Sequence, residues 1–164
     1  MNPNPEDWKD EIYKAYVAKW RAYEAEESER RRREGKIAIW LERSPDDAET
    51  FTKEHQAELR GVVGAIREKG VELEAPFMAV DAVDAVSGYT GELIIAITSI
   101  PAIAQVLVAW VKRKSGSKLR VEFHPDGKLK SVEAQTEKQV LSIAEALERE
   151  GRAKGTKAKK AKKK

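Results

Sequence analysis

Hydrophobic and polar positions follow two different periods along this chain. A period of three to four residues, typical of helices with one buried face, is found in residues 8–23, 48–66 and 140–147. Residues 6–34 contain no Gly or Pro and are rich in helix formers, which predicts one long helix. A period of two residues, typical of strands with one buried face, is found in residues 36–42, 71–75 and 119–123. A "PDG" turn after the last of these, and the stretch "KLKSVEA" beyond it, predict a hairpin. The order of elements predicts an α+β fold, with a long N-terminal helix before a small sheet of about four strands that carries helices on one face.

Local signals predict where the second helix begins and where the last helix ends. In "SPDD", Ser44 is placed as the N-cap of the second helix, and Gly151 is placed as the stop of the last helix. Gly61 and Gly64 fall inside the second helix, where glycine is unfavourable relative to alanine. We therefore expect both glycines to pack closely against a neighbouring element.

The stretch "ELIIAITSIPAIAQVLVAWVKRK", from Glu92 to Lys114, has no charged residue between positions 93 and 111. Its length and apolar character meet the criterion for a membrane span, and three cations follow it. A span would, however, leave about ninety polar residues to be carried across the membrane. Ser99 and Pro101 also resemble the start of a helix inside the run. We predict a helix buried against the sheet, with a membrane anchor at 93–111 as the alternative.

Aromatic residues form a stripe on the first half of the N-terminal helix. The second half, "EAEESERRRREGK", has no apolar face. The stripe either packs on the protein's own body or docks a partner or a second copy, since large, stiff side chains are typical interface anchors. The candidate partner-binding residues are Trp8, Ile12, Tyr16, Trp20 and Tyr23.

Charge is distributed unevenly. The chain has a net charge of +3, but residues 152–164 carry eight cations and no acid, so removing these cations leaves −5 on the rest. We divide the chain into a long amphipathic helix (1–35), an α+β body (36–151) and a Lys-rich tail predicted to be disordered (152–164). Weak, sequence-independent binding of nucleic acid is expected from the tail lysines Lys157, Lys159, Lys160, Lys162, Lys163 and Lys164.

Residues able to support catalysis are sparse. The chain has no cysteine and none of the common phosphate-binding, zinc-protease or serine-hydrolase motifs. His55 lies on an apolar helix face without a second metal ligand nearby, and Asp81 and Asp84 form an isolated carboxylate pair. We therefore expect no catalytic residues, no metal and no cofactor. The polar, acidic N-terminus does not resemble a signal peptide, which favours a cytoplasmic location.

One part of the chain resembles a known family. "VAWVKRK" at 108–114 follows an apolar helix and precedes a strand, a "PDG" turn and a second strand. Over about residues 70–140 this pattern resembles the effector-associated constant component family. The resemblance implies a non-enzymatic adaptor or regulatory component of a bacterial conflict or defence system, acting with a separately encoded effector such as a peptidase. The alternatives are a small nucleic-acid-associated protein that uses the basic tail, or the membrane-anchored protein.

Overall fold

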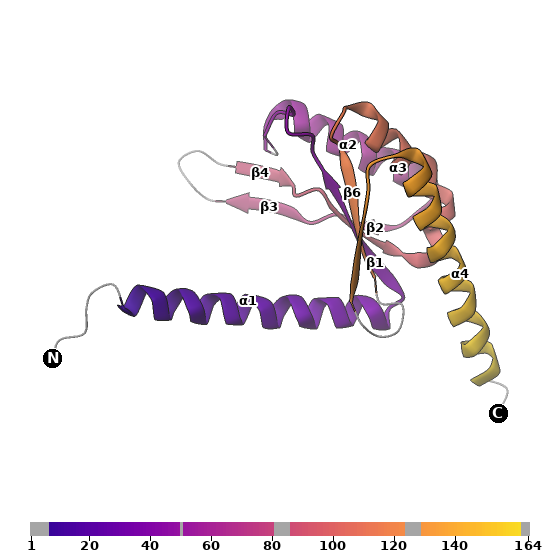
Figure 1. Cartoon of the computed structure of the whole chain (residues 1–164), viewed down its shortest axis with the longest axis horizontal. Helices are drawn as coiled ribbons and strands as arrows, with labels where there is room; N and C mark the ends of the chain where they lie inside the picture. The colour runs from indigo at the N-terminus through magenta and orange to yellow at the C-terminus, as the bar shows by residue number, and fades with distance from the viewer. Residues whose placement is uncertain (1–6, 50, 81–85, 124–128, 162–164) are drawn as a thin grey trace.

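An antiparallel sheet with helices on one face forms the body of the protein (Figure 1). The computed structural model describes residues 7–49, 51–80, 86–123 and 129–161. Five strands pair in the order β2-β5-β1-β6-β7 and comprise β1 (Lys36–Glu42), β2 (Leu73–Glu74), β5 (Glu92–Ala96), β6 (Lys118–Phe123) and β7 (Lys130–Ala134). A separate hairpin is made of β3 (Phe77–Val80) and β4 (Val86–Tyr89). The α+β fold predicted from the sequence is confirmed, with one strand more in the main sheet than expected.

The helices are α1 (Asp7–Arg33), α2 (Lys53–Glu68), the 3-10 turn η1 (Ile97–Ser99), α3 (Ile100–Arg113) and α4 (Glu137–Ala161). The hydrophobic core lies between the sheet and helices α2, α3 and α4. Ile39 at the centre of β1 is fully buried and pairs with Leu93 on β5 and Val121 on β6. Successive strand residues face opposite sides, so the period of two in the sequence places this row in the core. Burying each such side chain contributes about 1.5–3 kcal/mol.

The long apolar run contains a buried helix that starts inside it, as Ser99 and Pro101 indicated, but also a strand that was not predicted. Its first residues form β5, which lies between β2 and β1 in the sheet, and a helix begins only at Ile100. Ile94 and Ile95 favour a strand because they are β-branched, and Pro101 fits the first turn of a helix. In the part of the chain that the structure describes, no helix has both the length and the apolar character needed to cross a membrane.

The second helix starts later than predicted. α2 begins at Lys53 with Thr52 as its N-cap, not at Ser44. Asp47 pairs instead with cations at the end of α3, which holds the preceding loop in a turn. The expected close packing of Gly61 and Gly64 is also wrong, because no heavy atom lies within 4 Å of a Cβ built on either residue.

The last helix continues beyond Gly151 to Ala161, so the predicted stop was wrong. A Cβ at Gly151 would lie 3.4 Å from Cγ2 of Ile97, which is an ordinary van der Waals contact, so α4 passes directly against η1 at this residue. Lysine, arginine and alanine are good helix formers. Arg152 pairs with Glu148, and Lys154 pairs with Glu150 at 3.0 Å, so two i,i+4 ion pairs bridge the glycine. The predicted disordered tail is therefore helical as far as Ala161, and residues 162–164 lie outside the described part.

Candidate functional site

The first half of α1 extends away from the body (Figure 1). The helix itself was predicted and is confirmed at residues 7–33. No described side chain between Glu11 and Glu26 is buried, and only Val17 is half-buried. Tyr23, one of the five candidate partner-binding residues, is 55% exposed. The backbone of Trp8, Ile12, Tyr16 and Trp20 is helical, while their side chains lie outside the description.

The second half of α1 fastens the helix to the sheet, and sequence reasoning missed these contacts. Ser28 is buried, and the half-buried Arg31 reaches to 3.6 Å from a carboxylate oxygen of Glu92 on β5. At the turn after the helix, the carbonyl of Gly35 accepts a hydrogen bond of 3.0 Å from the amide of Ile97. The stretch judged to have no apolar face is thus the part that packs on the body, through polar contacts rather than an apolar stripe.

Glu92 lies near α1, where burial and the charge of Arg31 act on the pKa of its carboxyl group in opposite directions. Burial raises the pKa of its carboxyl group above the ordinary value, and the positive charge of Arg31 opposes this shift only in part. The repulsion of Glu122, on the same face of the sheet, adds to the upward shift. The ionised form of Glu92 is therefore less favourable in the folded protein than in water.

A second polar cluster joins the loop before α2 to the end of α3. The side chain of Asp47 is 1% exposed and accepts two hydrogen bonds from Arg113, of 2.6 and 3.2 Å, and one of 2.7 Å from Lys114. The amide of Ser44 donates to the same carboxylate at 2.8 Å. Burial alone would raise the pKa of Asp47, but the hydrogen bonds from Arg113, Lys114 and Ser44 hold it well below its ordinary value. Two of the three cations at the end of the apolar run, Arg113 and Lys114, are thus paired with a buried carboxylate.

His55 borders this cluster. Its side chain is 2% exposed, and its ring makes an edge contact with Trp110, with centroids 6.0 Å apart. Burial, together with the charge of Arg113, lowers the pKa of His55. Its Nδ1 atom is 3.6 Å from a carboxylate oxygen of Glu58 and has no hydrogen-bond partner among the described residues. His55 is therefore fully buried, with one of its ring nitrogens unsatisfied among the described residues.

Arg113 also stacks on the same tryptophan. Its guanidinium carbon lies 3.9 Å from the ring centroid of Trp110, which favours a charged arginine at this position. The Trp110 Nε1 group donates a hydrogen bond of 3.2 Å to the carbonyl of Lys118. The tryptophan and arginine of the "AWVKRK" segment therefore stabilise the junction between α3 and β6, and Lys112 is the most exposed of its three cations.

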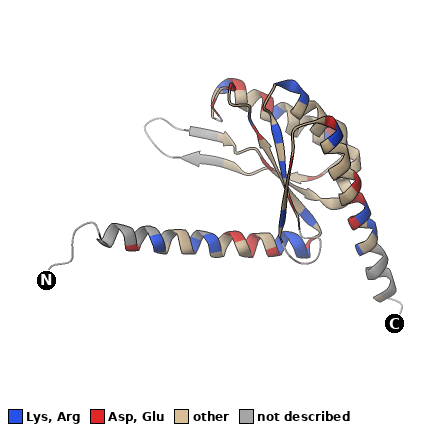
Figure 2. Cartoon of the chain, in the orientation of Figure 1, with Lys and Arg blue, Asp and Glu red and all other residues tan. Residues whose placement is uncertain are grey.

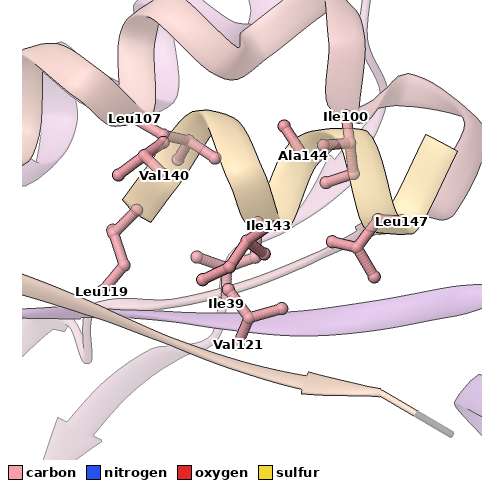
Figure 3. Close-up of a pocket in the computed structure, with 9 residues that line it drawn as sticks. All are labelled: Ile39, Ile100, Leu107, Leu119, Val121, Val140, Ile143, Ala144 and Leu147. Carbon is pink, nitrogen blue, oxygen red and sulfur yellow. The ribbon is translucent and has the colours of Figure 1, made fainter. Parts of the chain in front are cut away.

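One small void and one open cleft border the sheet. The void drawn in Figure 3 measures about 10 Å³ and is lined by aliphatic side chains from the sheet, α3 and α4, including Ile39, Leu107 and Leu147. Such a space holds one water molecule at most. An open cleft of about 610 Å³ lies at the β2 edge of the sheet, where its polar side chains are Lys36, Arg67, Glu72 and Glu74.

Within the described residues, no three potential metal ligands come together. Lys36 of β1, which lines the open cleft, is paired with both Glu34 and Glu74. The predicted pair Asp81 and Asp84 lies outside the described residues, as do Lys162, Lys163 and Lys164. Lys157, Lys159 and Lys160 lie on α4, but their side chains are not described.

Comparison of the chain with protein-family models, with curated proteins and with solved structures gives no match.

Proposed function

We propose that this protein is a non-enzymatic adaptor or regulatory component that binds another protein through the first half of α1. The observation that carries the proposal is the course of α1 in Figure 1, where the helix meets the body near its C-terminal end and leaves it before Glu27. An isolated helix in water gains most of its stability from packing one face against something else. A partner protein would supply that packing.

The sequence of the projecting half fits such a role. Trp8, Tyr16 and Trp20 follow one another at helical spacing, and aromatic anchors of this kind dominate binding energies when a partner's pocket covers them. An amphipathic helix that lays such a stripe into a groove is a recurring mode of protein recognition. The resemblance of residues 70–140 to the effector-associated constant component family makes a separately encoded effector of a bacterial conflict system, such as a peptidase, the proposed partner.

Site-specific photo-crosslinking tests this proposal. A photoreactive residue is placed at Tyr16, within the stripe, or at Ala18, which helical periodicity places on the opposite face and which is exposed. In cells that carry the native neighbouring genes, we expect a heterologous crosslink from position 16 and none from position 18. Mass spectrometry then identifies the partner.

Two results would contradict a heterologous partner. A crosslink from position 16 into the chain's own body would show that the stripe covers the protein itself. A product of twice the chain's mass, made of this chain alone, would show that a second copy occupies the stripe.

A further inference from the structure

The C-terminal part of α4 is a cationic helix. From Arg152 to the last residue the chain carries eight lysines and arginines and no acid, and the helix continues to Ala161. Figure 1 shows this end of α4 extending beyond the sheet, and in Figure 2 the part of α4 before it carries both acidic and basic residues. The rest of the chain has a negative net charge, so the positive charge is concentrated on one projecting segment.

Two cations at the start of this segment pair with carboxylates one turn earlier on the same helix. Glu148 pairs with Arg152, and Glu150 pairs with Lys154 at 3.0 Å. Lys157 is seven residues beyond Glu150, almost two helical turns, and only cations follow it among the charged residues. The charge that is available to an external anion therefore begins at Lys157.

The basic end of α1 lies at the same end of the molecule. Arg32 of α1 and Lys154 of α4 line one small crevice together with Gly35 and Glu150, although the two helices are far apart in sequence. Next to Arg32, the exposed Arg33 forms no ion pair within the described part of the chain. Arg33 thus adds a cation close to the point where α4 leaves the body.

We propose that the α4 extension from Lys157 onward, supported by Arg33, binds the phosphate backbone of duplex nucleic acid. Helical periodicity places positions 157 and 160 on one face of α4 and position 159 on the opposite face. The major groove of a duplex admits an α-helix between two rows of phosphates, so cations on both faces can be used at once. This inference is independent of the protein-binding role proposed for α1.

The sequence of the extension disfavours a lipid surface and sequence-specific binding. After Leu147 no large apolar residue follows, so the helix has nothing to insert into a membrane. A flat anionic surface would also contact only one face of the helix. No aromatic or amide side chain follows Gln139, so stacking on bases and the paired contacts that amides make with adenine are missing. Binding should rest mainly on phosphate contacts of the lysines, and different duplex sequences should bind nearly alike.

The test measures binding of the full chain to two 30-base-pair DNA duplexes of unrelated sequence by fluorescence anisotropy at several salt concentrations. The triple variant K157Q/K159Q/K160Q should bind about tenfold or more weakly, and the slope of log affinity against log salt should become shallower by about 0.9 for each lost contact. The matched control, K53Q/K69Q/K138Q, removes the same charge from exposed positions on the body and should bind nearly as the original protein does. Circular dichroism confirms that the helix content is retained.

A gain-of-binding variant strengthens the test. E150Q removes the carboxylate that pairs with Lys154, so affinity should increase and the salt slope should steepen by up to about 1. Equal losses in the two triple variants would overturn the proposal, since net charge alone would then explain binding. Retention on phosphatidylserine vesicles without binding to either duplex would also overturn it, in favour of a membrane surface.

Discussion

Asp47 and Arg113, which are 66 positions apart, face one another with 2.6 Å between a carboxylate oxygen and a guanidinium nitrogen. This pair fastens the loop before α2 to the end of α3. Since Arg113 also stacks on Trp110 and binds Glu58 at 2.7 Å, one side chain joins two helices and a loop. The pair makes the basic run after the apolar stretch a structural element rather than a free cationic patch.

Replacement of Asp47 by Asn should therefore strongly destabilise the protein. It leaves the guanidinium of Arg113 and the ammonium of Lys114 without their shared carboxylate, and breaking a buried pair in this way costs about 3–5 kcal/mol. Urea denaturation at neutral pH measures the change. The neighbouring exposed Asp46→Asn is the matched control and should change the free energy of unfolding by less than about 0.5 kcal/mol.

His55 should make stability depend on pH on the acidic side of neutrality. Its pKa in the folded protein is below the ordinary value of 6.5, so between these two values the unfolded chain binds more protons than the folded one. The free energy of unfolding should therefore fall as the pH decreases from 6.5 through the folded pKa. His55→Gln should flatten this dependence, whereas His124→Gln, which removes the chain's other histidine, should leave it in place.

Glu92 should act in the opposite direction. The pKa of its carboxyl group in the folded protein is raised above the ordinary value of 4.5. Between these two values the folded chain binds more protons than the unfolded one, so the free energy of unfolding should decline as the pH rises from 4.5 through the folded pKa. Glu92→Gln should remove this decline and increase the free energy of unfolding at pH 7. If thermal melting at pH 7 instead showed a clear loss of stability, the attraction of Arg31 would outweigh the cost of burial. Glu133→Gln, at an exposed position on the same face, is the control.

Gly64→Ala should stabilise the protein. No atom would lie within 4 Å of the new methyl group, and alanine is favoured over glycine inside a helix by about 0.5–1 kcal/mol. The same change at Gly91, where φ is +92° and the added Cβ would lie 2.9 Å from the carbonyl oxygen of Leu41, should destabilise it. Denaturation midpoints of the two variants, compared with the original chain, provide the measurement.

Local patterns predicted the elements that have one buried face. Ile37, Ile39 and Leu41 recur at every second position and are buried, and β1 lies where that alternation placed it, although the small Ala38 on the other face is buried as well. The same reasoning failed for β5, because Ile94 on the opposite face of the sheet is only 6% exposed and the strand shows no alternation. A strand buried on both faces cannot be distinguished from a buried helix by periodicity.

Long-range contacts account for the other differences. The "SPDD" signal is a valid local start for a helix, but Asp47 gains more from two cations that are distant in sequence than from capping α2. At Gly151 the local stop signal fails because good helix formers follow it and two i,i+4 ion pairs bridge the glycine. For the candidate site, the sequence predicted the helix α1 and its aromatic stripe. Only the structure shows that the part of α1 before Glu27 extends away from the body.

The free energy of unfolding of a chain lacking residues 1–22 tests most directly whether the first half of α1 is available to a partner. The truncation removes Trp8, Tyr16 and Trp20 but retains Ser28 and Arg31, which hold the helix on the sheet. We predict a free energy within about 0.5 kcal/mol of that of the full chain, because no described side chain between Glu11 and Glu26 is buried. A loss of about 3 kcal/mol or more, the usual cost of removing a buried aromatic side chain, would show that the stripe belongs to the body and would contradict the proposed binding surface.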